Sequence, residues 1–208
     1  AAETGIFMVD SFGSLRWYLK TPAVNYAVQQ TDRGSVLWVS SNKIYEYSLK
    51  GDEIENITIP EKYGPIHHDI VDIGGRKFLL TVNHPNKETN EDFVILYDAA
   101  TESVVTEWNL NESIPKTAHF VADDVDWFHN NAIAFDSRDN SLLLSGQRSG
   151  VAKISQSNEL IWMLTDPERF RGASSEFQEK ILFNQFGDII TWGQHDIRVD
   201  EEADVYYL

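Results

Sequence analysis

Cysteine is absent from the 208 residues, so disulfides, thiolate metal sites and cysteine nucleophiles are excluded. Basic residues are scarce, because 17 Lys and Arg stand against 33 Asp and Glu, giving a formal net charge of −16. This balance argues against a nucleic-acid or anionic-membrane partner, since both need a basic patch. No apolar run reaches the ~20 residues of a membrane span, and no signal peptide or phosphate-binding glycine loop is recognisable.

Apolar residues make up 42% of the chain, and the six Trp, eight Tyr and eleven Phe suit sheets. Alternating segments separated by short polar turns predict groups of four strands. The predicted groups cover 25–59, 68–110 and 129–164, with two further strands in 5–19 and two in 195–208. A tryptophan recurs in the last strand of several groups, at Trp17, Trp108 and Trp162. Such repeats predict an all-β protein, a β-propeller of four-stranded antiparallel blades, with an ordinary β-sandwich as the alternative.

We expect residues 1–208 to form a single β-propeller fragment, with three full blades and a partial blade at each end. Two connections are long, at 111–125 and 165–184, and the second includes a predicted short helix at 174–181. Loops of this length in a compact domain are usually functional or disordered. Both lead into a strand that begins with a histidine, so we expect them at the same end of the propeller.

Histidine recurs at equivalent places in the repeat. His68, His129 and His195 begin the first strands of three consecutive blades, and first strands line the central channel of a propeller. We therefore expect three imidazoles at one mouth of the channel. Such groups can bind a metal, hold an oxyanion when protonated, shuttle protons or act as a nucleophile. His84, before a proline, and His119, in a long loop, are not assigned to this group.

A zinc site is the main alternative for these histidines, although the spacing of common zinc motifs is lacking. Arg148 follows the second strand of the His129 blade, and its guanidinium suits tetrahedral oxyanions such as sulfate or phosphate. An anion site in so acidic a protein requires local cations, which Arg148 and imidazolium groups would supply. We therefore expect no metal and no other cofactor.

Four short segments resemble, in this order, the bacterial aryl-sulfate sulfotransferases (arylsulfotransferases) that use no nucleotide sulfate donor. The segments are Ile-His-His-Asp at 66–69, Asp-Trp-Phe-His-Asn-Asn at 126–131, Ser-Gly-Gln-Arg at 145–148 and Gly-Gln-His-Asp at 193–196. The resemblance implies a six-bladed β-propeller, of which this chain carries about four blades' worth of strands. It also implies a periplasmic or secreted enzyme with a homodimeric assembly.

The resemblance further implies that a histidine takes a sulfuryl group from a phenolic sulfate ester and passes it to a phenol acceptor. The matching residues are His195 as nucleophile, His68, His129 and Arg148 as groups that hold sulfuryl oxygens and assist proton transfer, and His67, Asn130 and Asn131 as further substrate-binding residues. The family pattern Ser-Ser-Arg-His departs from Ser-Gly-Gln-Arg here, so the arginine is displaced by one residue. On a strand this displacement would turn it to the other face. Of the two adjacent histidines, we expect His68 to point inward.

Two other functions are compatible with the sequence. One is a non-catalytic propeller that binds a protein or glycan partner, and the other is a metal-dependent propeller lyase or lactonase with Asp69 and Asp196 as ligands. The fold alone does not decide between them. The three-fold recurrence of histidine favours the transferase, because a binding face does not require it.

Overall fold

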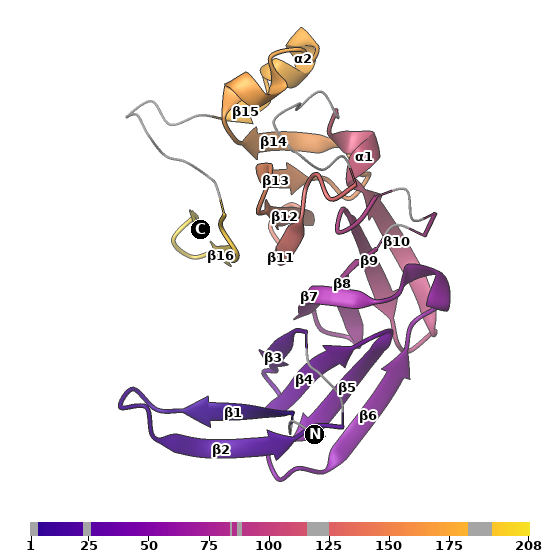
Figure 1. The fold of residues 1–208 in the computed structure, drawn as a ribbon, viewed down its shortest axis with the longest axis vertical. Helices are drawn as coiled ribbons and strands as arrows, with labels where there is room; N and C mark the ends of the chain where they lie inside the picture. The colour runs from indigo at the N-terminus through magenta and orange to yellow at the C-terminus, as the bar shows by residue number, and fades with distance from the viewer. Residues whose placement is uncertain (1–3, 23–25, 84, 87–88, 116–124, 183–192) are drawn as a thin grey trace.

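The computed structural model describes residues 4–22, 26–83, 85–86, 89–115, 125–182 and 193–208. Most of the regular structure in these residues is β-strand, and consecutive strands pair with one another (Figure 1). The predicted all-β fold with four-stranded antiparallel units is confirmed. No described helix is long and apolar enough to cross a bilayer.

Three sheets hold four consecutive antiparallel strands each. The first contains β3 (Val28–Gln30), β4 (Ser35–Ser40), β5 (Lys43–Ser48) and β6 (Glu53–Thr58). The second contains β7 (Ile66–Asp72), β8 (Lys77–Val82), β9 (Phe93–Asp98) and β10 (Ser103–Asn109). The third contains β11 (Asn130–Asp136), β12 (Ser141–Gly146), β13 (Gly150–Ile154) and β14 (Leu160–Leu164).

Two hairpins flank these sheets in the sequence. They are β1 (Gly5–Val9) with β2 (Leu15–Lys20), and β16 (Arg198–Asp200) with β17 (Val205–Tyr207). The short helical segments are η1 (Glu61–Tyr63), α1 (Leu110–Ser113), η2 (Pro167–Phe170) and α2 (Ser175–Gln178). The helix predicted at 174–181 is present only as α2. The last residue of the predicted helix, Ile181, belongs instead to β15 (Ile181–Leu182). This strand was not predicted, and it pairs in parallel with β14.

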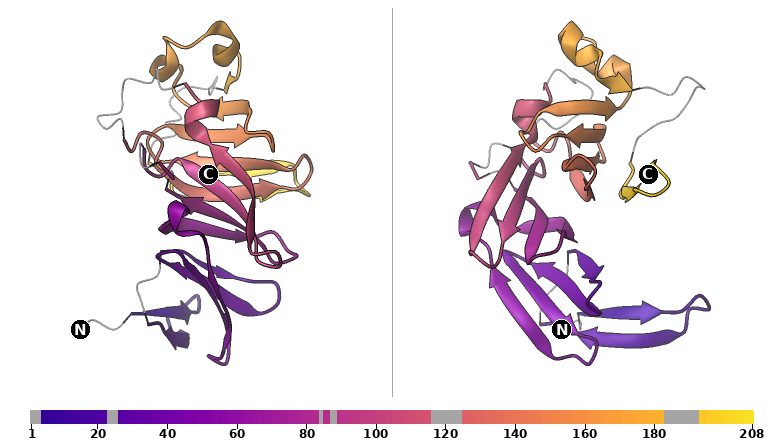
Figure 2. Two further views of the ribbon diagram at one scale, coloured as in Figure 1. Left: turned by 90° about the vertical axis from the view of Figure 1, so that its right-hand side faces the viewer. Right: turned by 180° about the vertical axis from the view of Figure 1, so that it is seen from behind.

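The sheets follow one another along a curved row, with β3, β7, β11 and β16 on its concave side (Figures 1 and 2). These are the first strands of successive units: β7 contacts both β3 and β11, and β11 contacts β16. This is the radial order of β-propeller blades, in which first strands face the axis. It places residues at the beginning of each first strand near one another.

Packing between neighbouring blades forms the core. The middle strands β4, β8 and β12 are buried along nearly their whole length, because each blade is covered on both faces. Between the second and third sheets, Leu79 and Val94 pack in one cluster with Leu144 and Ala152. The near-continuous apolar sequence of these strands follows from burial on both faces.

The recurring tryptophans join one blade to the next. Trp17 in β2 donates its indole N–H to the carbonyl of Leu49, at 2.7 Å, and Trp108 in β10 donates to the carbonyl of Ser155, at 2.9 Å. Each acceptor directly follows the third strand of the next blade. Trp162 in β14 likewise contacts the next unit along the chain, because its ring packs against that of Tyr206 in β17. The repeat noticed in the sequence is therefore an inter-blade contact.

A buried ionic group links the third sheet to β17. The Lys153 ammonium lies 2.9 Å from Asp136, 2.8 Å from Asp139 and 3.0 Å from the Tyr206 hydroxyl. Hydrogen bonds from Arg138, and then from Lys153, hold the pKa of Asp136 well below its usual range although the side chain is buried. These ion pairs and hydrogen bonds compensate charged groups that the packing of two blades has removed from water.

Replacing Lys153 by methionine should lower the free energy of unfolding by about 3 kcal/mol, because Asp136 then stays buried with one cation fewer. The matched control is Lys77→Met. Lys77 is more exposed and lies 4.0 Å from Asp98, so its loss should cost under about 1 kcal/mol. Urea denaturation of both variants measures the difference, and equal losses would contradict the assignment.

Candidate functional site

The histidines at the strand entrances have an unusual backbone. His68 has φ 44° and His129 has φ 57°, both in the left-handed region that non-glycine residues seldom adopt. Neither lies in a hairpin turn. His68 interrupts β7, whose register against β8 shifts between Ile66 and Ile70. Such a bulge redirects a side chain out of the ladder, and strained residues of this kind cluster at functional sites.

Thr81 of β8 stabilises the bulge in β7. Its hydroxyl donates to the carbonyl of His67 and accepts from the backbone N–H of Asp69, at 3.1 Å. The threonine thus satisfies backbone groups that the interrupted ladder leaves without strand partners. It fixes the direction in which His67 and His68 project.

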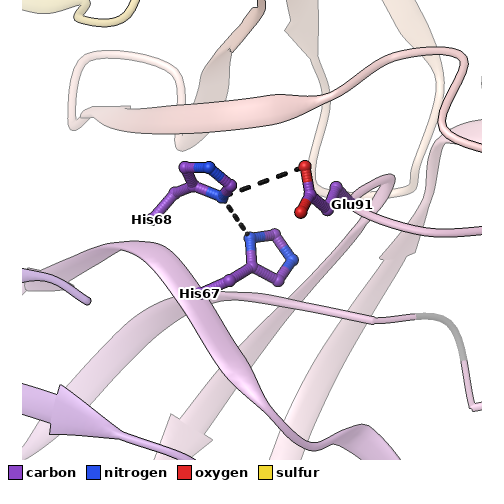
Figure 3. A group of neighbouring side chains, drawn as sticks. All are labelled: His67, His68 and Glu91. Carbon is purple, nitrogen blue, oxygen red and sulfur yellow. Dashed lines mark hydrogen bonds and ion pairs between the residues drawn. The ribbon is translucent and has the colours of Figure 1, made fainter. Parts of the chain in front are cut away.

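Of the three histidines expected at the channel mouth, the structure brings His68 and His129 together, and His67 joins them. The ring centroids of His67 and His68 lie 5.0 Å apart, and those of His68 and His129 lie 5.2 Å apart. The Nδ1 atoms of His67 and His68 are separated by 2.9 Å (Figure 3). His67 is buried, whereas His68 is partly open to solvent. The inward residue expected from the sequence was His68, yet both rings belong to the same group.

Two carboxylates that were not predicted from the sequence complete this group. The Nδ1 atom of His129 lies 2.8 Å from Asp126 Oδ2, with which it forms a hydrogen bond, and 2.7 Å from Glu91 Oε2. Glu91 Oε2 also lies 4.0 Å from His68 Nδ1. Asp126 could have been found, because it lies three residues before His129 in the quoted motif. Glu91, in the connection before β9, has no counterpart in the repeat that would reveal it.

Arg148 is bound to one carboxylate of this cluster. Its guanidinium makes a 2.9 Å ion pair with Asp126 Oδ2 and donates to the Asp126 carbonyl at 2.8 Å. Asp126 therefore bridges Arg148 and His129. The preceding residue, Gln147, has its side-chain amide 3.3 Å from His195 Nε2. The one-residue displacement seen in the sequence thus places glutamine, not arginine, against His195.

His195 is exposed at the entrance to β16, and its ring has a defined orientation. Its Nδ1 lies 2.7 Å from the carbonyl of Gly193, and Gly193 donates its N–H to the carbonyl of Gln147 at 3.1 Å. A carbonyl can only accept, so Nδ1 carries the proton and Nε2 carries the lone pair. The Gln147 amide can then donate to Nε2. This tautomer makes Nε2 the nucleophilic atom of the ring.

The two asparagines predicted to bind substrate lie in β11. Asn131 donates its amide to the carbonyl of Gln194 at 3.1 Å, and Gln194 donates to the carbonyl of Gly146 at 2.7 Å. These bonds hold the segment that carries His195 against the third sheet. Asn130 is fully buried; its backbone N–H donates to the carbonyl of Glu91 at 2.7 Å, and among the described residues its side-chain amide has no hydrogen-bond partner.

Burial keeps the inner imidazoles neutral. Burial, and then the nearby His68, lower the pKa of His67 to about 3, while the backbone of Val82 opposes the shift. The pKa of His68 is lowered by burial and then by the charges of His129 and His195. Burial raises the pKa of Glu91. The site therefore combines neutral imidazoles with partly buried carboxylates.

Asp69 and Asp196, the ligands proposed for a metal-dependent lyase, face the backbone. Asp69 accepts the N–H of Ile70 and that of Ile133 in β11, both at 2.8 Å, and burial raises its pKa to about 6. Asp196 accepts the N–H of Ile197 at 2.9 Å. In the described residues, the groups with metal-ligand geometry are His67, His68 and Glu91, and Glu91, Asp126 and His129. Neither aspartate is among them.

The sequence model of the family described as Arylsulfotransferase (ASST) matches residues 1–208. The chain belongs to the arylsulfotransferase family. This confirms the family resemblance that the four short segments predicted. Of the functions considered from the sequence, family membership supports the transferase.

Two curated relatives carry the same family name. The chain is 23% identical over 260 residues to "Arylsulfate sulfotransferase AssT" of Escherichia coli O6:H1, covering 97% of this chain and 43% of that protein. It is 22% identical over 233 residues to "Arylsulfate sulfotransferase AssT" of Lelliottia amnigena, covering 85% of this chain and 38% of that protein. The chain thus spans less than half the length of these relatives.

A solved structure has a similar fold. A protein of unknown function from Bacteroides caccae aligns with a TM-score of 0.51 at 13% identity, over 81% of this chain and 61% of that one. At this identity the similarity concerns the fold alone.

The buried His67 predicts a pH dependence of stability. Its folded pKa of about 3 lies below the unfolded value of about 6.5, so between these pH values the unfolded chain binds a proton that the folded chain does not. The free energy of unfolding should therefore fall by a few kcal/mol as the pH drops from about 6.5 toward 3. In His67→Phe this slope should be shallower than in the wild type. Chemical denaturation in metal-free buffer at several pH values measures it, and parallel curves would contradict the assignment.

Proposed function

We propose that this chain is the channel-lining part of an aryl-sulfate sulfotransferase. The enzyme moves a sulfuryl group from a phenolic sulfate ester to a phenol acceptor through a sulfohistidine, without a nucleotide donor. The observation that carries the proposal is the environment of His195, whose exposed ring directs Nδ1 to a backbone carbonyl and Nε2 to Gln147, and whose charge lowers the pKa of His68. Membership of the arylsulfotransferase family supports the same reaction.

We further propose that residues 1–208 form one β-propeller fragment of a longer periplasmic or secreted protein, which assembles as a homodimer. Its partners are small molecules, the phenolic sulfate donor and the phenol acceptor. The curved row of three four-stranded sheets with a hairpin before and after it supports this organisation. The relatives' greater length agrees with it.

The first half of the reaction begins at His195. Its Nε2 lone pair attacks the sulfur of the donor, an N–S bond forms, and the S–O bond to the aryl group breaks with its electron pair leaving on the phenolate. The ring gains positive charge, which the Nδ1–H bond to the Gly193 carbonyl disperses. The Gln147 amide, 3.3 Å from Nε2 in the resting state, is placed to turn toward a sulfuryl oxygen.

His129 is suited to proton transfer. Its Nδ1 faces Asp126 and Glu91, which hold the ring in place and stabilise its protonated form. A proton on Nε2 would then pass to the departing phenolate. In the second half, the same nitrogen takes the proton of the acceptor phenol, whose oxygen attacks sulfur. The N–S bond breaks, and the lone pair returns to His195.

The remaining predicted residues support this centre in the proposal. His68 faces the sulfuryl oxygens, and the buried His67 holds the ring of His68 in place. Arg148 contributes positive charge through its ion pair with Asp126. Asn131 positions the segment before His195, and Asn130 supplies an amide at the base of the site.

Replacement of His195 by alanine in the full-length protein should abolish transfer from 4-nitrophenyl sulfate to a phenol, because binding energy cannot replace a nucleophile. His129→Ala should slow transfer by about 10²–10⁴-fold, the usual contribution of a general acid–base group. Steady-state kinetics should be ping-pong, since donor and acceptor use one histidine in turn.

The matched control for these variants is Arg198→Ala, which removes an exposed ion pair with Asp196 close to His195 in the chain. It should leave kcat within about two-fold of the wild type. Normal turnover in His195→Ala, or a requirement for both substrates before any phenol leaves, would refute the proposed mechanism.

A further inference from the structure

His67, His68 and Glu91 form a compact set of nitrogen and oxygen ligands at one side of the proposed transfer site (Figure 3). Their ligand atoms all lie within 4.8 Å of one another. The two histidine Nδ1 atoms are 2.9 Å apart, and His68 Nδ1 lies 4.0 Å from Glu91 Oε2. Ligands about 2.0–2.1 Å from a tetrahedral zinc ion lie ~3.3 Å apart, between these two distances.

The hydrogen bonds around Glu91 leave one of its oxygens available. The Nδ1 proton of His129 is directed to Asp126, which also binds Arg148, so this neighbouring group is satisfied internally. Glu91 Oε2 lies 2.7 Å from the same Nδ1 but, with that proton directed to Asp126, this buried oxygen receives no hydrogen bond among the described residues. A buried carboxylate oxygen without a donor is costly, and a cation would remove that cost.

The orientation of His67 gives a second, independent indication. Its ring is buried, its Nδ1 lies 2.9 Å from His68 Nδ1, and its Nε2 has no hydrogen-bond partner among the described residues. A buried ring nitrogen without a partner is costly, and an imidazole can bind a metal ion through either nitrogen. When neither Nδ1 carries a proton, the two lone pairs can both point at one ion instead of being joined by a hydrogen bond.

We propose that His67, His68 and Glu91 bind a divalent transition-metal ion of the zinc class. Two imidazoles and a carboxylate suit such ions, and three protein ligands leave a coordination position open. The absence of cysteine means that no thiolate elsewhere in this chain competes for the ion. This revises the expectation of no metal drawn from the sequence.

A divalent ion would also change the net charge of the site. Two carboxylates, Glu91 and Asp126, lie at the site, and Arg148 is bound to Asp126. This balance is unfavourable for a sulfate ester, and a divalent ion on Glu91 would reverse it. In that case His68 acts as a metal ligand, and the positive charge near the sulfuryl oxygens comes from the ion. Only this consequence rests on the proposed function; the binding itself rests on the side-chain geometry.

The test is zinc binding by tag-free, full-length protein, measured by equilibrium dialysis and elemental analysis after treatment with a chelator. The wild type should bind about one zinc ion per chain at this site. Glu91→Gln and His67→Phe should each weaken its affinity by more than about 100-fold, since even the loss of a residue that only contacts a metal ligand costs about 10–100-fold. Titration with Co²⁺ should give visible absorption bands that both variants lose.

The matched control is Glu102→Gln. Glu102 is an exposed hairpin residue with φ 52°, close to the φ 56° of Glu91, so both variants replace a left-handed glutamate by its amide. The control should keep the wild-type zinc affinity within about two-fold. Circular dichroism shows whether each variant is folded, and Glu91→Gln is close to isosteric.

Failure to bind zinc in the wild type, or unchanged affinity in folded Glu91→Gln, would overturn the inference. The result is separable from the proposed function. A chain that binds zinc through these residues but transfers no sulfuryl group would refute the transferase and leave the metal site standing. A chain that transfers sulfuryl groups and binds no zinc would refute the metal site and leave the transferase standing.

Discussion

The side chain of Asp69 fixes the spacing between two inner strands. One of its oxygens accepts the N–H of Ile70 in its own strand, and the other accepts that of Ile133 in the next blade. His68 directly precedes Asp69, and His129 lies just before the strand that contains Ile133. The 5.2 Å separation of the two histidine rings therefore depends on this inter-blade contact. Blades that each bury both faces against a neighbour hold the contact in place.

The left-handed residues are the second constraint on the site. His68, Glu91 and His129 all have φ between 44° and 57°, and their side chains meet. Such conformations cost about 1–3 kcal/mol each and persist only where the surroundings enforce them. Here Thr81 binds the backbone on both sides of His68, and the carbonyls of Glu91 and His129 accept backbone N–H groups of Asn130 and Gln147. The fold thus holds a reactive group of imidazoles and carboxylates that a relaxed backbone would separate.

Much of the fold could be predicted from the sequence because its signals are local and repeated. Alternation and turn residues mark the strands, and the recurring Trp17 and Trp108 mark the blades that they join. The equivalence of His68 and His129 follows from the same repeat. Glu91 could not be predicted, because it lies in a connection where no periodicity relates it to the histidines. The parallel strand β15 was missed for a similar reason, since two residues are too few to show a pattern.

Gln147 and Arg148 are adjacent in the sequence, but their side chains have different partners. Adjacent residues at a strand end face different neighbours, and only the structure shows that Gln147 meets His195 while Arg148 meets Asp126. The sequence could identify arginine as a cation for the site. It could not show that a carboxylate already binds that cation.

In the proposed reaction, His195 Nε2 carries the sulfuryl group between donor and acceptor. Rapid quenching of the full-length enzyme with 4-nitrophenyl sulfate and no acceptor, followed by peptide mass spectrometry under non-acidic conditions, detects this intermediate directly. We expect one added sulfuryl group on the peptide that contains His195, and its loss when a phenol is added. A sulfuryl group on His68 or His129 instead, or no covalent adduct while turnover continues, would contradict it.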